Sequence, residues 1–249
     1  MQRPHVVVVV VTYEAQSFIE GLLSRIPAVI CGDEALVLVS DDASADETVE
    51  RTERWVALHP ERPVKICRRP TNLGYGGNQK ATMAWAIEEG ADVVVLLHGD
   101  EQYPPELIPD LVDVLWASDA PAAFGSRMIL PGGARAGGMP RRRLLGNRSL
   151  SWLLNRATRT AHTEWFSGFR AYRADVLEAV GFEGLPDGFD FDVALAIRLL
   201  EHGHELAEMP IPTHYGDELS RVPLLRTGLA TIGHAWRGRR AFGRTRTAR

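Results

Sequence analysis

The first hundred residues alternate between short apolar runs and segments in which apolar residues recur with a helical period. The apolar runs have the length and β-branched composition of buried strands, and they lie at residues 5–13, 35–40, 64–69 and 92–100. Strands that alternate with helices are typical of repeated βαβ units around a parallel sheet. Ser17 with Glu20 and Ser44 with Glu47 fit a capping box, so we expect a helix to begin near each pair.

The rest of the chain predicts further elements and one long irregular stretch. We expect helices at 105–118, about 144–159 and about 190–202, and strands at 122–127, 167–173 and 205–211. Residues 131–143 are rich in glycine and arginine and too long for a simple connection, so we expect a mobile loop there. The pattern predicts a single α/β domain at about residues 1–216, with a mostly parallel sheet flanked by helices, followed by a basic helical tail at 217–249.

Composition narrows the class of protein. A hydrophobic share of 45% and a charged share of 24% are ordinary for a soluble globular chain and exclude disorder. The longest apolar run, the six valines Val6–Val11, is far shorter than the roughly 20 residues that span a bilayer, and no secretory leader is visible. We therefore expect a cytoplasmic protein. Its two cysteines, Cys31 and Cys67, predict neither a disulfide framework nor a structural zinc site.

The net charge of −4 conceals a basic end of the chain, because eight arginines and no acidic residue follow Glu218. Such a tail can contact an anionic membrane surface, which would place the protein peripherally at the inner face of the membrane. It can equally be a solvated helix. We expect no nucleic-acid partner, and the sequence leaves the oligomeric state open.

Polar residues follow each of the first four predicted strands. In an open parallel sheet the carboxyl ends of the strands meet in one crevice, where ligands bind, so these residues form one candidate site. The aspartates before Ser44 can also be plain turn residues. The set comprises Thr12, Tyr13 and Glu14; Asp41 and Asp42; Asn72, Gly74, Gly76 and Gly77; and His98, Asp100 and Gln102.

Several local motifs in this order resemble those of a known family. They are "VTYEAQSFI" at 11–19, "VSDDASADET" at 39–48, "NLGYGGNQKA" at 72–81 and "HGDEQYPPE" at 98–106, with "FGSRM", "SGFRAYR", "FDFD" and "MPIPTHYGDE" further on. The ordered set is similar to the inverting glycosyltransferases of family 2, and within them to polyprenyl-phosphate sugar transferases of the dolichyl-phosphate mannosyltransferase kind. The resemblance covers about residues 5–216 and implies a GT-A, Rossmann-like fold. It divides the domain into a nucleotide-binding half at about 5–103 and an acceptor half at about 104–216.

The resemblance implies a divalent cation, Mn²⁺ or Mg²⁺, that stabilises the leaving diphosphate. Asp100 is the first candidate for a ligand and for a catalytic role, with His98 and Gln102 beside it and His214 as a second imidazole. His98 stands where the family's Asp-x-Asp-x-Gln-x-Pro-Pro segment has its first aspartate, and an imidazole suits manganese better than magnesium. Alternatively His98 meets only the diphosphate or water, and Glu101 restores the missing charge.

The resemblance also assigns the nucleotide-sugar site. Tyr13 is placed to stack on the base, Asp41 or Asp42 to accept from a base N–H, and Glu14 to reach the ribose. The remaining residues implied here are Thr12, Asn72, Gly74, Gly76, Lys80, His98, Gly99 and Asp100. Uracil and guanine both present an N–H donor, so UDP-sugar and GDP-sugar donors both remain open.

Two kinds of acceptor remain open. Arginine forks suit a phosphate, and the candidates for a lipid phosphate are Arg127, Arg141, Arg142, Arg143 and Arg170. The hydroxyl of a soluble glycan or metabolite would instead require a carboxylate base, for which Asp190 or Asp192 is available, although either can simply cap a helix. A third hypothesis is a non-catalytic relative that binds sugar nucleotides but has lost metal affinity through His98.

Overall fold

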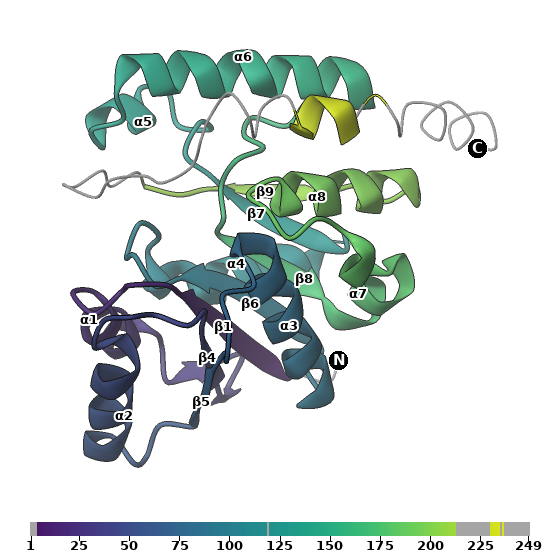
Figure 1. Cartoon of the computed structure of the whole chain (residues 1–249). Helices are drawn as coiled ribbons and strands as arrows, with labels where there is room; N and C mark the ends of the chain where they lie inside the picture. Colours follow the sequence, from purple (N-terminus) through teal and green to yellow (C-terminus); the bar gives the residue numbers. More distant parts are fainter. Residues whose placement is uncertain (1–3, 119, 213–229, 235, 237–249) are drawn as a thin grey trace.

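A seven-stranded sheet forms the centre of the fold, and helices pack against both of its faces (Figure 1). The computed structural model describes residues 4–118, 120–212, 230–234 and 236. The strand order is β5-β4-β1-β6-β8-β7-β9. The strands are β1 (Val6–Thr12), β4 (Leu36–Asp41), β5 (Val64–Arg68), β6 (Val93–His98), β7 (Ala122–Ser126), β8 (Arg170–Arg173) and β9 (Ala207–Pro210). All seven predicted strands are confirmed, and a short β2–β3 pair (Val29–Ile30 and Asp33–Glu34) was not predicted.

The sheet is mostly parallel, as predicted. Strand β1 pairs in parallel with β4 on one side and with β6 on the other, and β5 extends this half beyond β4. Strand β8 runs antiparallel between β6 and β7, and β9 returns parallel to β7. The two halves of the domain therefore meet at β8, in one continuous sheet.

Alternate residues of β1 serve two separate cores. Val6, Val8 and Val10 pack with helices α1 (Ile19–Arg25), α2 (Thr48–Leu58) and α4 (Ile108–Ala117). Val7 and Val9 pack on the opposite face with α3 (Tyr75–Glu88), α7 (Ala174–Val180) and α8 (Phe191–Glu201). Because successive side chains of a strand point to opposite faces, an uninterrupted valine run is what a strand covered on both sides requires. Two short 3₁₀ turns complete this set, η1 (Pro105–Leu107) and η2 (Phe182–Gly184).

The predicted mobile loop at residues 131–143 contains regular structure, which corrects the expectation. A short helix α5 (Gly133–Ala136) lies within it, and Arg141 to Arg143 form the first turn of α6 (Arg141–Thr158). The helix thus begins three residues before the predicted start, with Pro140 at the N-cap position, where its carbonyl accepts a hydrogen bond from the Leu144 N–H (3.0 Å). Helix α6 lies along the outside of the molecule, beyond α8 (Figure 1).

Among the described residues, no helix is both long enough and apolar enough to cross a membrane. Most of the predicted tail at 217–249 lies outside the described residues. Its described part, residues 230–234 with Trp236, is helical.

Gly76→Ala tests the contact between α3 and the segment before α8. A Cβ at Gly76 would lie 2.6 Å from both Phe191 Cβ and Pro186 O, so we expect this change to lower the free energy of unfolding by about 1–3 kcal/mol. Gly146→Ala is the control, because nothing lies within 4 Å of a Cβ at that position of α6. It should be neutral or stabilise by up to about 1 kcal/mol in urea unfolding. Equal stability of the two variants would contradict the packing described here.

Candidate active site

The carboxyl ends of β1, β4 and β6 lie side by side. In the register of the sheet Thr12 pairs with Asp41, and Val11 pairs with His98. The residues that follow these three strands are therefore neighbours, as predicted from the order of strands and loops. This edge of the sheet is the candidate donor site.

Asp41 and Asp42 are buried, and both carboxylates accept hydrogen bonds from other residues of the protein. Asp41 accepts hydrogen bonds from the Ser44 backbone N–H (2.9 Å), the Ser44 hydroxyl and the Thr12 hydroxyl (3.3 Å). The predicted capping box at Ser44 is therefore wrong, since its hydroxyl bonds Asp41 rather than the helix. Neither Ser17 nor Ser44 caps a helix, because α1 and α2 begin after Phe18 and Glu47 without a side-chain cap.

Asp42 holds the loop that follows β5 against the loop that follows β4. It accepts from the backbone N–H groups of Leu73 (2.7 Å) and Gly74 (3.0 Å). Burial raises the pKa of Asp42, while these two N–H groups act in the opposite direction. At 1% and 4% exposure, Asp41 and Asp42 order the loops, and a direct contact with a base stays a prediction.

The rim of the same edge is open. Tyr13 is 46% exposed, and Glu14 and Asn72 are also exposed. The Glu14 backbone is held by the Ser44 hydroxyl in a left-handed conformation (φ 52°), which turns the chain outward after β1. These three residues are the accessible members of the predicted nucleotide set.

The glycine turn and Lys80 pack against the acceptor half, which corrects one assignment. The N–H groups of Gly76 and Gly77 donate to Asp187 O at 2.7 and 3.2 Å. Lys80 Nζ lies within 2.9 Å of Glu183 O, 2.6 Å of Leu185 O and 2.7 Å of Asp187 Oδ1. An ammonium has three N–H donors, so all three are used here and Lys80 has none left for a nucleotide.

The loop after β6 presents Asp100. Gly99 allows this loop to lie close to β1, since a Cβ at that position would be 2.7 Å from Thr12 Cγ2. Among the described residues, the Asp100 side chain accepts one hydrogen bond, from the Gln102 N–H (3.2 Å) to Oδ1. Glu101 has φ 55°, and its carboxylate lies 3.9 Å from Arg25 beside α1. The structure therefore does not support the alternative that Glu101 restores charge at the metal.

The residues near Asp100 fit a cation that is shared with a substrate. The described residues contain no cluster of three or more His, Cys, Asp or Glu side chains that could enclose a metal. A Mg²⁺-type site needs only one or two protein ligands, because substrate phosphates and water supply the others. Asp100 offers a carboxylate oxygen without a partner among the described residues, and His98 offers a ring nitrogen.

His98 is linked by hydrogen bonds to Tyr75 of α3 and, through Tyr75, to Asp192 of α8. Its Nε2 lies 3.2 Å from the Tyr75 hydroxyl, which donates to Asp192 Oδ2 at 2.6 Å. Burial and the adjacent Asp192 carboxylate raise the pKa of Tyr75 well above its ordinary value, so it remains a hydroxyl. Asp192 is 6% exposed, and its Oδ1 is buried without a partner among the described residues.

Arg170 does not reach the crevice, which corrects its assignment to an acceptor phosphate. It is fully buried, and its guanidinium donates to the backbone carbonyls of Ser167 (2.7 Å), Trp165 (2.8 Å) and Asp192 (2.6 Å). Burial alone disfavours the charged guanidinium, but Tyr172 and Asp192 outweigh it and the pKa of Arg170 is raised. This arginine is a structural cation.

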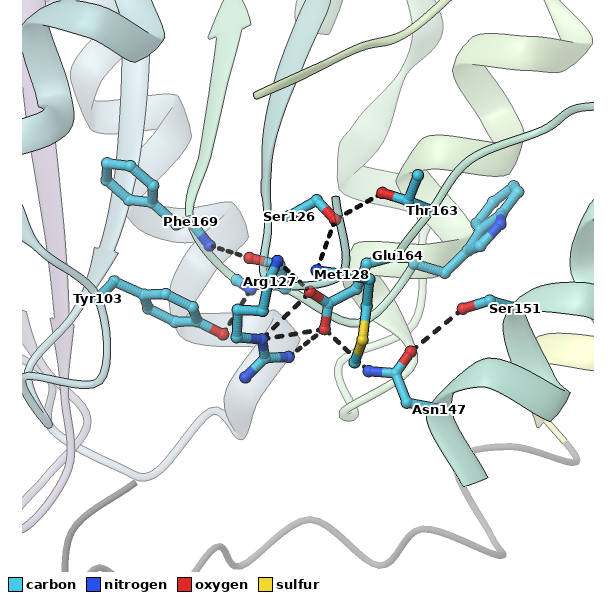
Figure 2. A network of polar contacts seen from close by, with 12 residues as sticks. Tyr103, Ser126, Arg127, Met128, Asn147, Ser151, Thr163, Glu164 and Phe169 are labelled. Atoms are coloured by element: carbon cyan, nitrogen blue, oxygen red, sulfur yellow. Dashed lines mark hydrogen bonds and ion pairs between the residues drawn. The ribbon is translucent and has the colours of Figure 1, made fainter. Parts of the chain in front are cut away.

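Arg127 is also paired inside the protein. Figure 2 shows its guanidinium facing Glu164, which has a fully buried side chain. The carboxylate accepts from Arg127 Nε (3.0 Å), from the Arg127 backbone N–H (2.8 Å) and from Asn147 of α6 (2.8 Å). An acceptor phosphate would have to compete with Glu164, so the structure favours a positioning role for Arg127.

The two predicted base candidates occupy different environments. Asp190 precedes α8, and its Oδ2 lies 2.8 Å from Nε2 of His234. Asp192 lies in the first turn of α8 and is held by Tyr75. The predicted ligand His214 lies outside the described residues.

Three residues of the site were not found from the sequence, namely Tyr75, Glu164 and His234. Tyr75 lies inside the motif "NLGYGGNQKA", but only the asparagine, the glycines and the lysine of this motif were assigned to the predicted nucleotide site. Glu164 ends a stretch from Met128 to Thr163 that contains no acidic residue, which is a signal that sequence analysis could have used. His234 belongs to the basic tail and carried no recognisable pattern.

Comparison with known proteins identifies relatives of this chain. The family model described as glycosyl transferase family 2 matches residues 7–181. An undecaprenyl-phosphate mannosyltransferase from Micrococcus luteus is 32% identical over 183 residues, which cover 72% of this chain and 71% of that protein. A polyprenol monophosphomannose synthase from Mycolicibacterium smegmatis is 30% identical over 176 residues, or 70% of this chain and 65% of the relative.

Solved structures share the fold. A mannosyltransferase from Pyrobaculum calidifontis in complex with GDP-Man and Mn²⁺ has a TM-score of 0.59 and 18% identity, covering 100% of this chain and 76% of that chain. A glucosyl-3-phosphoglycerate synthase from Mycobacterium tuberculosis in complex with Mn²⁺, UDP-glucose and phosphoglyceric acid has a TM-score of 0.63 and 19% identity, covering 92% and 80%. The predicted mostly parallel sheet flanked by helices is thus confirmed.

Glu164→Gln tests the buried ion pair. Removing the charge of Glu164 breaks its buried ion pair with Arg127, so we expect the free energy of unfolding to fall by about 3–5 kcal/mol. Glu106→Gln is the matched control, because Glu106 pairs with Arg25 (2.7 Å) at the surface and should contribute only about 0–1 kcal/mol. Urea unfolding measures both. Similar losses in the two variants would show that Arg127 and Glu164 do not form the pair described.

Proposed function

Because the chain belongs to glycosyl transferase family 2, we propose that it moves a sugar from a UDP- or GDP-sugar to a polyprenyl phosphate, with inversion at the anomeric carbon. As a member of this family it is a glycosyltransferase. The names of two relatives at 32% and 30% identity make mannose the first sugar to test.

The outward face of α6 is the observation that favours a lipid acceptor. No acidic residue lies between Met128 and Thr163, a stretch that contains seven arginines. On α6, Leu145 is 68% exposed and Trp152 is 65% exposed. The exposed arginines on this helix are Arg141, Arg142, Arg148 and Arg156. An open groove of about 400 Å³ lies on the same face, lined by Arg148, Ser149, Trp152 and Leu153.

This surface has the chemistry of a membrane-surface helix. Exposed leucine and tryptophan side chains can enter the headgroup region, while arginines beside them meet lipid phosphates. The opposite face of α6 is anchored, since Asn147 bonds Glu164 and Leu154 lies in the core. We therefore assign the peripheral contact with the cytoplasmic membrane face to α6. The contact predicted for the basic tail falls mostly outside the described residues.

The donor half supplies the leaving-group chemistry. When bound, the cation held through Asp100 neutralises the charge that develops on the diphosphate. Tyr13 and Glu14 offer an exposed aromatic face and a carboxylate to the nucleoside. A phosphate acceptor is already an anion at neutral pH, so placement matters more than a strong base. This is consistent with Asp192, whose Oδ2 is bonded to Tyr75 and whose Oδ1 is buried.

Transfer to a glycan hydroxyl is the second candidate, and one contact favours it. The Asp190 carboxylate and the His234 ring are 2.8 Å apart, a pairing that can orient an imidazole as a general base. The first candidate needs no such base. Activity of Asp190→Asn toward each acceptor class therefore separates the two.

Asp100→Asn should lower the transfer rate by about 100-fold or more, because it removes the charge that holds the cation at the leaving diphosphate. The measurement is sugar transfer from a panel of UDP- and GDP-sugars, with polyprenyl phosphate or a neutral glycan as acceptor. Excess chelator should have the same effect on the unmodified protein. Full activity of Asp100→Asn would remove the metal assignment, and transfer to the neutral glycan alone would end the lipid-phosphate proposal.

Leu145→Ala combined with Arg148→Gln should weaken binding to vesicles that contain anionic lipid by about 10-fold, since each arginine near such a surface contributes about 1 kcal/mol. The matched control is Leu58→Ala with Arg54→Gln on α2, where both side chains are also exposed. Co-sedimentation with vesicles measures both pairs. Equal binding by the two double variants would show that α6 is not the membrane contact.

A further inference from the structure

The His98 ring is fixed by its neighbours on several sides. It meets Tyr75 edge to face at 5.3 Å and Tyr103 at 5.7 Å between ring centroids. A Cβ at Gly168 would lie only 2.4 Å from His98 Cε1, so the glycine makes room for the ring edge. Among the residues that the structure describes, the ring makes one hydrogen bond, from Nε2 to the Tyr75 hydroxyl. Nδ1 has no partner among them.

Proton counting fixes the direction of that bond. The Tyr75 hydroxyl has a single proton, which it donates to Asp192 Oδ2 over the short 2.6 Å contact. Toward His98, 3.2 Å away, the Tyr75 oxygen can then only accept. Nε2 must therefore carry a hydrogen, because two lone pairs would otherwise face each other. In a neutral imidazole with its proton on Nε2, the lone pair is on Nδ1.

Arg170 explains why Asp192 is the acceptor. A guanidinium remains charged in proteins, and here it is fully buried with its donors on three backbone carbonyls. Carbonyl dipoles satisfy its N–H groups but do not cancel its charge, and Asp192 is the carboxylate whose charge acts on it. An ionised carboxylate can only accept hydrogen bonds. With Asp192 ionised beside Arg170, Tyr75 donates its proton to Asp192, and His98 Nε2–H donates to the Tyr75 oxygen.

We propose that Tyr75 and Asp192 are positioning residues that hold His98 with its proton on Nε2, so that Nδ1 is the atom offered to the cation beside Asp100. The consequence for the metal rests on the proposed metal-dependent transfer, whereas the tautomer does not. Arg170, from β8, supplies the opposing charge. Four elements, β6, α3, α8 and β8, thereby determine the state of one side chain at the donor site.

A histidine needs this arrangement where an aspartate would not. A carboxylate presents two equivalent oxygens and several lone pairs, so small rotations leave a ligand in place. A neutral imidazole presents one lone pair in the ring plane, and the wrong tautomer presents none in the required direction. Partners that orient a ligating histidine typically change metal affinity by about 10- to 100-fold when they are removed.

The tautomer can be observed in the full chain without metal or substrate. In ¹⁵N-histidine NMR, with His98 assigned from the signal lost in His98→Asp, we expect the neutral ring to carry its proton on Nε2 and none on Nδ1. In Tyr75→Phe we expect a mixture of the two tautomers. A neutral ring with its proton on Nδ1 in the unmodified chain would overturn the proposal. This readout is independent of the sugar, the nucleotide and the acceptor, so a wrong acceptor assignment leaves it unchanged.

The metal consequence is tested by Mn²⁺ binding in the presence of UDP or GDP, with free Mn²⁺ followed by electron paramagnetic resonance. Tyr75→Phe should weaken Mn²⁺ binding about 10- to 100-fold. Tyr103→Phe is the control, because it removes another buried hydroxyl beside His98 that bonds the Gly168 N–H (2.8 Å) and not the ring. It should leave the affinity within about twofold, in keeping with a group outside the hydrogen-bonded chain.

A double variant separates orientation from general damage to the fold. In a His98→Asp background, Tyr75→Phe should no longer change the Mn²⁺ affinity, and His98→Asp itself should shift the metal preference toward Mg²⁺. An equal loss of affinity from Tyr75→Phe with either residue at position 98 would overturn the positioning role. If Tyr75→Phe does not fold, the NMR result on the unmodified chain decides the proposal.

Discussion

The buried guanidinium of Arg170 is the interaction on which the junction between the two halves depends. Burying such a charge costs several kcal/mol unless it is paired and its N–H groups are satisfied. Here it bonds the carbonyls of Trp165, Ser167 and Asp192, and the Phe124 ring covers it at 4.1 Å. These contacts join β8, the segment before it and α8. They also set the position of Asp192, and through Tyr75 the position of His98 at the donor edge.

A second buried arginine organises the acceptor side by the same physical rule. Arg127 at the end of β7 pairs with Glu164, and Asn147 attaches α6 to that pair (Figure 2). Since the inner face of α6 is fixed in this way, its outer face carries exposed Trp152 and the exposed Arg141, Arg142, Arg148 and Arg156. Buried arginines thus hold the scaffold, and we propose that the exposed arginines of α6 meet an anionic surface.

The sequence predicted the sheet well because its signals are local. Valine-rich runs and the polar residues that end them required no knowledge of distant contacts, and the seven strands and the shared edge of Thr12, Asp41 and His98 follow from them. The errors concern partners that are distant in the sequence. Lys80 bonds Glu183, Leu185 and Asp187, and Arg170 bonds the backbone carbonyl of Asp192. Neither Lys80 nor Arg170 is therefore available to a ligand.

The positive charge of Lys80 and Arg170 could not distinguish them from ligand-binding residues, because their burial is set by tertiary packing. The start of α6 was missed for a related reason. Arg141 to Arg143 looked like part of a basic loop, but they form the first turn of α6 after Pro140. Tyr75 lacked any signal of its own, since its importance depends on His98 and Asp192 meeting it from β6 and α8.

We infer that the donor's metal diphosphate is held at the end of β6, next to the ends of β1 and β4. Anomalous diffraction from Mn²⁺ in crystals grown with UDP or GDP tests this inference. We expect one manganese peak within bonding distance of Asp100 and His98 Nδ1, with the diphosphate on its far side and Arg170 still buried. A peak bound by other residues, or a nucleotide bound away from this edge with no metal, would overturn the inference.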